Sequence, residues 1–300
     1  MRTIAILSLL AAGACGDKTP SDTGDTANNN TATPTTTSAT TNTGQTTTTG
    51  TGTGTTTSTT GTTGTTGTTG TTGTTTSTTD AVCGSLDFDS SDDEVIIKSS
   101  ASLEFSAPFT ISTWLRIDEH RGSSTILDKT GLDGSGWVLE INEEGHVSFG
   151  GSHSGTGAHW GIRAGSGFTA SIWEHYAVVF TRDEAKMYRN GTLVSTEAVR
   201  RDVEVNSVEL RFGGGDADGH FDGAISDVRI WIKELTREDV QYCMYNVPVE
   251  ESLRDMGAYW TFNEGRGEAL NDYSGNENTG VIGGATWTED CPSHKSEDAS

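Results

Sequence analysis

The sequence predicts an all-β fold, an antiparallel β-sandwich with one short helix, preceded by a disordered linker. Three observations predict it. Short runs of alternating apolar and polar residues recur from residue 86 onward, Gly, Asn and Asp punctuate these runs, and residues 17–80 hold almost no aliphatic side chains. Alternation of apolar and polar residues, with a period of two, is typical of a half-buried strand. A segment with so little apolar surface cannot offset its ordering entropy.

The N-terminal residues are predicted to be a targeting signal and not part of the folded domain. Residues 1–14 carry one positive charge at Arg2 and an apolar stretch from Ile4 to Ala14, which is too short for a permanent membrane helix and fits a secretory signal peptide. Small residues run directly into Cys15 and resemble the lipobox of bacterial lipoproteins, which implies lipidation of the Cys15 thiol. Gly16 follows, where an Asp retains many such proteins at the inner membrane. We therefore expect a cell-envelope protein, lipid-anchored at the outer membrane or cell surface, with the membrane as a partner through this anchor. An ordinary signal peptide with an incidental Cys15 is the alternative.

Residues 15–80 are expected to form a disordered, lipid-anchored linker. Five consecutive Gly-Thr-Thr triplets run from Gly61 to Thr75. The repeat lacks proline, so it does not predict a collagen triple helix. We expect a flexible stalk that holds the folded domain, residues 81–292, away from a membrane; residues 293–300 are expected to be a disordered tail.

The strands of the folded domain follow from alternation, taken in order. Leu86 to Asp89 alternates apolar and acidic residues, and Val95 to Ile97 follows an acidic turn. In Phe109 to Ile117 the apolar residues share one face, with Thr113 as its polar member. Further strands are expected at Trp137–Ile141, His146–Phe149, Tyr176–Phe180, Met187–Tyr188 and Leu193–Val194, within Phe221–Leu235, and in the runs AYWTF (258–262) and GATW (284–287).

Turn and cap signals complete the pattern. Glu144-Gly145 predicts a hairpin, and Asn190-Gly191 favours a type I′ turn because both residues tolerate positive φ. After the strand whose Val228, Ile230 and Ile232 are expected on one face, Thr236 is the predicted N-cap of the helix. Many short strands and one helix indicate a sandwich.

Several runs resemble the laminin-G-like (LamG), concanavalin A-type jelly-roll family. They are FDGAISDVRIWIKEL (221–235), AYWTFNEGRG (258–267), DYSGNENTG (272–280) and GATW (284–287), with FTISTWL, GWVLEIN, IWEHYAVVF and YRNGTLV upstream. The resemblance covers nearly all of residues 86–287 and implies a jelly-roll sandwich. It does not imply one function, because this fold serves lectins, hydrolases, adhesins and spacers alike.

The order of these runs departs from the family. In many members the YWxF block precedes the LxFD strand, whereas here it comes last. The resemblance therefore implies a circular permutation that places Trp287 beside Leu86. It also brings together Cys83 and Cys291, which we expect to form a disulfide. Cys243 is then expected to be a buried thiol, and Cys243–Cys291 is the rival pairing.

The chemistry of the chain favours binding over catalysis. A net charge of −23 argues against nucleic acid and against docking on anionic lipid. The sequence contains no ExDxE string of the kind that glycosidases of this fold carry, and no GxSxG, HExxH or phosphate-binding loop. We therefore expect no enzyme.

A calcium site is expected in the loop after residue 271. Asp272, Asn276 and Asn278 offer oxygen ligands at alternate positions around Gly275, as a hard cation prefers. The family often carries Ca²⁺ near this loop, which implies Asp227 as another ligand. An Asn/Gly turn with no ion is the alternative.

A glycan site is the other expectation. Trp160 lies in a Gly/Ser/His-rich stretch with His153, His159 and Arg163 nearby, and rim loops collect binding residues. A partly buried strand tryptophan is the alternative. The function expected is a non-catalytic surface module for glycan or a cell-surface protein. A glycan-processing enzyme with an atypical site, or a purely structural lipoprotein, are the other possibilities.

Overall fold

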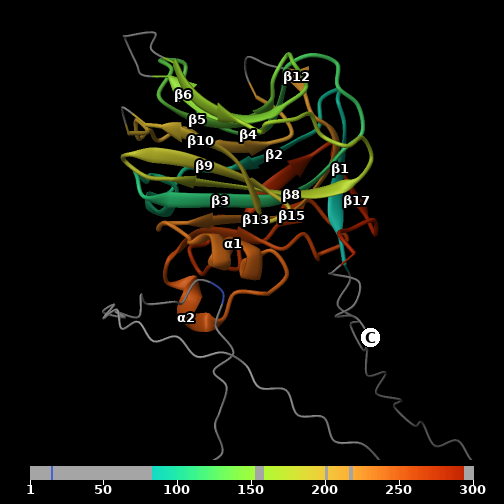
Figure 1. Ribbon diagram of the computed structural model, residues 1–300. Coiled ribbons are helices and arrows are strands. Elements are labelled where there is room, and N and C mark those ends of the chain that lie inside the picture. Colours follow the sequence, from blue (N-terminus) through green and yellow to red (C-terminus); the bar gives the residue numbers. More distant parts are fainter. Residues whose placement is uncertain (1–14, 16–82, 153–158, 200–201, 216–218, 294–300) are drawn as a thin grey trace, which may run out of the picture. The chain divides into compact units, whose positions relative to one another are not determined.

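The computed structural model describes Cys15 and residues 83–152, 159–199, 202–215 and 219–293. These residues form two sheets that face one another, which confirms the expected sandwich (Figure 1). No helix in the described part of the chain is long and apolar enough to cross a membrane.

We call the two sheets sheet A and sheet B. Sheet A consists of β1 (Ser85–Asp89), β3 (Phe109–Ile117), β8 (Trp173–Phe180), β9 (Glu184–Arg189), β10 (Thr192–Ala198), β13 (Asp222–Trp231), β14 (Met256–Trp260) and β17 (Thr286–Thr288). Sheet B consists of β2 (Glu94–Ile97), β4 (Ser124–Thr130), β5 (Gly136–Ile141), β6 (Val147–Ser152), β7 (His159–Arg163), β11 (Leu210–Phe212), β12 (Gly219–His220), β15 (Ala269–Leu270) and β16 (Gly280–Gly283).

The strand orders show how the chain crosses between sheets. Sheet A runs β10-β9-β8-β3-β13-β1-β17, with β14 also paired to β13. Sheet B runs β15-β16-β2-β11-β4-β5-β6-β7, with β12 beside β4. The pairs are antiparallel except for β12 and β4, which run parallel. Helical segments are η1 (Ala101–Leu103), α1 (Arg237–Cys243) and α2 (Glu250–Leu253).

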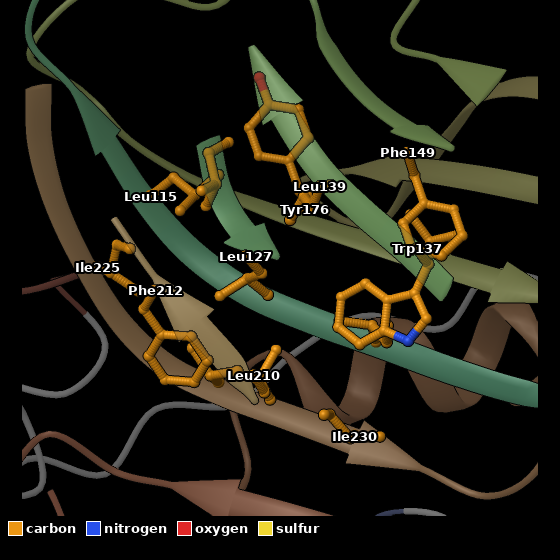
Figure 2. Packing of buried hydrophobic residues seen from close by; sticks show 14 of the residues in the cluster. Leu115, Leu127, Trp137, Leu139, Phe149, Tyr176, Leu210, Phe212, Ile225 and Ile230 are labelled. Carbon is orange, nitrogen blue, oxygen red and sulfur yellow. The ribbon is translucent and has the colours of Figure 1, made fainter. Parts of the chain in front are cut away.

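The main core fills the space between the sheets. In β3 the expected apolar face is buried there, and Thr113 is buried with it. Figure 2 shows Leu115 and Ile225 of sheet A beside Leu127, Leu139 and the Trp137–Phe149 pair of sheet B. The large rings dominate this core, since each fully buried aromatic side chain stabilises the fold by about 2–3 kcal/mol.

A second, smaller core lies between sheet A and α1. The helix begins where expected, because the Thr236 side chain accepts a hydrogen bond from the Asp239 amide while the Asp239 carboxylate accepts from the Thr236 amide. Val240 and Cys243 of the helix pack against Trp231.

The end of β13 differs from the expected pattern, in which Ile232 shares the apolar face of the strand with Val228 and Ile230. Trp231 is fully buried under α1, and Ile232 lies just beyond the strand with 39% of its surface exposed. Val228 and Ile230 face the main core as expected.

The hairpin turn expected between β9 and β10 is present. Asn190 and Gly191 have φ values of 49° and 69°, the positive pair that a type I′ turn needs. Thr192 lies opposite Arg189 directly across the turn.

The two ends of the domain meet, as the permutation implies. Leu86 of β1 lies opposite Trp287 of β17, and Cys83 is bonded to Cys291. This is the disulfide that we expected.

The expectation for Cys243 was wrong. Cys243 is neither a lone thiol nor the partner of Cys291, since it is bonded to Cys15. Assigning Cys15 to a lipid leaves an odd number of cysteines, whereas the structure pairs all four. One sulfur atom cannot hold both a disulfide and a thioether, so lipidation at Cys15 and this bond exclude one another.

Candidate functional site

An open hollow of about 760 Å³ lies over β4, β5, β6 and β7 of sheet B. Figure 1 shows β4, β5 and β6 on the side of the molecule opposite to α1 and α2. A pocket of this size suits a small ligand. Its lining residues are Asp128, Thr130, Gly131, Leu132, Gly134, Val138, Glu140, Asn142, Ser148, Phe149, Gly150, Gly151, Trp160, Gly161, Ile162, Arg163 and Glu197.

Strand register assembles the floor of the hollow from two rows of residues. The first row runs across the four strands from Asp128 to Val138, Gly150 and Gly161, each opposite the next. Residues that lie opposite one another point to the same face of a sheet. This row therefore passes from a carboxylate through one aliphatic side chain to bare backbone.

The second row is polar. Glu140 lies opposite Ser148, and Ser148 lies opposite Arg163. The Ser148 hydroxyl donates to a Glu140 carboxylate oxygen at 3.0 Å. Arg163 is ion-paired with Glu144 from the β5–β6 turn. Hydroxyls and carboxylates in such a row can exchange hydrogen bonds with a polar ligand.

The glycine pair in the floor keeps the hollow open. A Cβ built on Gly150 would come within 2.6 Å of the Trp160 carbonyl oxygen, which is too close. At Gly161 the nearest atom would be the Phe149 carbonyl oxygen at 3.3 Å, so a side chain there is tight but feasible. Two opposed glycines let a ligand approach the backbone.

Asp128 and Leu132 flank the first row. The Thr130 amide and hydroxyl donate to one oxygen of Asp128 at 2.8 and 2.6 Å, which fixes the carboxylate at the β4 end. Leu132, in the β4–β5 turn, has 97% of its surface exposed. The hollow thus combines polar and apolar groups within one face.

The residues expected to bind a glycan lie in different places relative to the hollow. Trp160 lines the hollow, but its ring packs inward on Phe149 and Phe180 with centroids 5.6 and 5.1 Å away. Trp160 is therefore the partly buried strand tryptophan that we kept as the alternative. Arg163 lies at the hollow with an exposed side chain. His159 begins β7, and His153 lies outside the described residues.

Sequence reasoning missed Asp128, Glu140, Ser148 and the glycine pair. The alternation of 137–141 and 146–149 does contain this information. Residues such as Glu140 and Ser148, which alternate with the buried apolar residues, must lie on the outer face. Their pairing also follows from the hairpin expected at Glu144-Gly145. The link to β7 requires the register of β6 with β7, which the alternation of each strand does not fix.

The loop expected to bind calcium is closed by hydrogen bonds within the protein. One oxygen of Asp272 accepts from the amides of Tyr259 and Ser274, both at 2.9 Å. The other accepts from the Ser274 hydroxyl and from the amide and side chain of Asn278, at 2.9–3.0 Å. Five donors point at this carboxylate, so in this arrangement it does not fit a cation.

The two asparagines of the loop are also committed to protein partners. The Asn276 amide group donates to the carbonyl oxygens of Met256 and Gly257 at 2.9 and 3.1 Å. Asn278 is 3% exposed, and its side-chain oxygen accepts from the Ser100 hydroxyl at 2.5 Å. These contacts describe a structural Asx-type turn, and the calcium site stays a prediction.

Asp227 serves a buried ion pair. Its carboxylate accepts from the guanidinium of Arg229, with one N–O distance of 2.9 Å, and both side chains are about 95% buried. Arg229 also donates to the carbonyl oxygens of Cys243 and Asn246, and it lies 5.0 Å from the Tyr259 ring. A left-handed φ of 53° at Asp227, within a strand irregularity, directs it to this pair.

One group of carboxylates lies elsewhere in the described residues. Asp89, Asp92 and Asp93 gather at the β1–β2 turn. Burial raises the pKa of Asp93 above its ordinary value, and the neighbouring acids add to the rise. The Asp93 carboxylate accepts from the Asp89 amide at 2.8 Å, so it closes the turn.

The fold agrees with a family match over the middle of the chain. Residues 89–241 match the model of the Concanavalin A-like lectin/glucanases superfamily. The chain belongs to this superfamily. The superfamily name covers both binding proteins and enzymes, so membership shows the fold and leaves the activity open.

One solved structure supports the same fold. A candidate carbohydrate-binding protein from Bacteroides ovatus ATCC 8483 is 18% identical in sequence. Its structure matches with a TM-score of 0.55 and covers 69% of the present chain and 60% of its own chain. The present chain therefore spans less than two thirds of that protein. The SAP-like pentraxin from Limulus polyphemus is 12% identical, with a TM-score of 0.46 over 68% of this chain and 96% of that chain. No curated protein sequence matches the chain.

Proposed function

We propose that this superfamily member is a non-catalytic binding module that holds a glycan in the hollow of β4–β7. The observation that carries the proposal is the open floor of Gly150 and Gly161 beside the polar row Glu140–Ser148–Arg163. The carboxylate of Glu140 and the hydroxyl of Ser148 can form hydrogen bonds with sugar hydroxyls. Val138 and the two glycines can pack against the apolar face of a sugar ring. The similar Bacteroides ovatus protein, a candidate carbohydrate-binding protein, supports this proposal.

A glycan array probed with the folded domain tests the proposal. We expect retention on a restricted set of glycans and no release of product when the same glycans are incubated with the protein. Retention that persists unchanged after the hollow is filled by a Gly161→Val substitution would place binding elsewhere and contradict the proposal.

A glycan-processing enzyme is the second candidate, and one observation favours it. Asp128 and Glu140 place two carboxylates in one hollow, and glycoside hydrolysis uses such a pair as acid and base or nucleophile. Against this, Thr130 and Ser148 hold these carboxylates as hydrogen-bond acceptors. Sugar release from a polysaccharide panel, lost in Glu140→Gln, would favour the enzyme.

Display from the cell envelope is the other part of the proposal. We infer it from the apolar N-terminal stretch and from the small residues before Cys15. The Cys15 sulfur carries either a lipid or the bond to Cys243. Intact mass of the membrane-extracted protein, before and after reduction, distinguishes the two. An added diacylglyceryl mass supports the anchor, and a gain of four hydrogens on reduction, two for each of the bonds Cys15–Cys243 and Cys83–Cys291, excludes it.

A further inference from the structure

The two disulfides in the described part of the chain are held in different ways. Cys83 and Cys291 flank β1 and β17, which pair with one another, and the Ser85 hydroxyl donates to the Asp290 carbonyl oxygen at 2.6 Å in the same seam. These contacts keep the two sulfurs close together whether or not the bond is formed. Cys15 is in a different situation, because it is the one residue before position 83 that the structure describes.

We propose that Cys15–Cys243 is a thiol-exchange site, which small thiols open under conditions that leave Cys83–Cys291 closed. Exchange frees the Cys15 sulfur from α1 and leaves the two sheets folded. The site lies on the α1 side of the molecule, opposite to β4, β5 and β6 (Figure 1), so the inference goes beyond glycan binding and does not depend on it.

The first argument is the length of chain between the sulfurs. About 70 residues, predicted to be a flexible linker, connect Cys15 to Cys83 and the folded domain. A group on such a linker has an effective concentration of about millimolar or less. Once open, Cys15–Cys243 therefore reforms much less readily than Cys83–Cys291, whose sulfurs are positioned by paired strands. A low effective concentration makes a disulfide easier to reduce at equilibrium.

The second argument is the charge beside Cys15. Arg229 donates to the Cys15 sulfur at 3.9 Å, and Cys15 is fully buried at this contact. A neighbouring cation stabilises a thiolate, and burial strengthens that attraction. Because a stabilised thiolate is a better leaving group, Arg229 favours opening of the bond at the Cys15 side. Arg229 also pairs with Asp227, so this contribution is smaller than the first.

The exchange consumes two molecules of a small thiol. The first, as its thiolate, attacks the Cys243 sulfur; a bond to Cys243 forms, the Cys15–Cys243 bond breaks, and the electron pair remains on the Cys15 sulfur. The second attacks the small-thiol sulfur of the mixed disulfide, and Cys243 leaves as a thiolate. The two protein thiolates take up the protons of the two small thiols. The products are two cysteine thiols and one small-molecule disulfide.

Exposure acts on the rate in the opposite direction. Cys15 and Cys243 are 0% and 5% exposed, whereas Cys83 and Cys291 are half-buried. A thiol therefore reaches Cys83–Cys291 more easily. The inference concerns the equilibrium, which is reached only when exchange at both bonds is complete.

Exchange also controls when Cys15 can carry a lipid. Acylation needs the free Cys15 thiol, which the open state provides and the closed state withholds. This consequence rests on the proposed display from the cell envelope, whereas the exchange itself does not. The exchange is therefore tested on protein that has not been acylated.

Glutathione buffers test the inference on the full chain. Oxidised protein is brought to equilibrium over a series of [GSH]²/[GSSG] ratios, quenched with acid, alkylated and mapped by mass spectrometry of its peptides. We expect Cys15–Cys243 to be half-reduced at a ratio at least about 100-fold lower than the ratio that half-reduces Cys83–Cys291. Equal ratios, or the reverse order, would overturn the inference.

Two alanine pairs are the matched variants. Cys15→Ala with Cys243→Ala should leave the glutathione ratio for Cys83–Cys291 unchanged and should lower the urea midpoint less than Cys83→Ala with Cys291→Ala does. Loss of the folded state when Cys15–Cys243 opens would show a structural bond and overturn the inference. Oxidised protein that lacks the Cys15–Cys243 bond would overturn it as well.

Discussion

Leu86 lies opposite Trp287 in the antiparallel pair of β1 and β17, so the first and last strands of the domain are neighbours. Two further contacts close the same seam. The Ser85 hydroxyl donates to the Asp290 carbonyl oxygen at 2.6 Å, and Arg116 is ion-paired with both Asp87 and Asp290. The first and last strands of the domain thus lie at one place, which a permuted order of the family's runs requires.

The Cys83–Cys291 bond should stabilise this seam. The cross-link closes almost the whole domain into one loop, with a sequence separation of 208. Replacing both cysteines by serine should lower the free energy of unfolding by about 2–5 kcal/mol. Urea denaturation with the Cys15–Cys243 bond left intact measures the effect. An unchanged midpoint would show that the strand pairing alone holds the ends.

Arg229 should be costly to remove by itself. Arg229→Met leaves Asp227 buried without its counter-charge and should destabilise the protein by about 3–5 kcal/mol. The double variant Asp227→Asn with Arg229→Met should recover part of that loss, because no unpaired charge remains. Chemical denaturation of both variants checks this coupling. Equal stability of the single and double variants would contradict a paired charge as the cause.

Lys129 should make stability rise with pH in the alkaline range. Burial lowers the pKa of Lys129 from 10.5 to about 8, although Glu104 opposes the shift. Between these two values the unfolded chain keeps a proton that the folded protein has lost, so raising the pH favours folding. The gain across this window is up to about 3 kcal/mol.

Lys129→Met is the comparison for that prediction. The variant loses the hydrogen bond from Lys129 to the Val208 carbonyl oxygen at 2.7 Å, a cost that does not vary with pH. The unfolding free energy of wild type should therefore rise relative to that of the variant as the pH rises from about 8 to 10.5. Parallel curves would show that Lys129 titrates normally in the folded protein.

Asp272 should stabilise its loop without help from a cation. Asp272→Ala removes an acceptor of five hydrogen bonds and should lower the unfolding free energy by about 3 kcal/mol. The loss should be the same in Ca²⁺ and in EDTA. A wild-type melting temperature that rises in Ca²⁺ and falls in EDTA, with no such difference in Asp272→Ala, would instead establish the calcium site predicted from the sequence.

Most of the fold could be predicted because its signals are local. Alternation in Phe109–Ile117, the Asn190-Gly191 turn and the Thr236 cap each depend on a few neighbouring residues. The meeting of Leu86 with Trp287 followed from the order of the family's runs. The burial of Trp231 and Arg229 did not, because it depends on α1 packing on the outer face of β13.

The site was harder to predict for the same physical reason. Trp160 was predicted to bind a glycan because it is an aromatic residue among glycines. Its ring packs inward because the next residue of β7, Gly161, faces outward. Asp128 and Glu140 come together only through the register of β4 with β5. Asp227 is directed to Arg229 by a strand irregularity that alternation does not reveal.

Filling the floor of the hollow tests the central claim most directly. Gly161→Val places a β-branched side chain where a glycan is proposed to lie, in a strand position where a side chain is tight but feasible. Gly165→Val is the matched control, because a Cβ there has the same nearest clearance of 3.3 Å and the residue is outside the hollow's lining. Calorimetric titration with the glycan that wild type retains should show binding lost in Gly161→Val and kept in Gly165→Val. Equal affinity in all three proteins would contradict a glycan site on β4–β7.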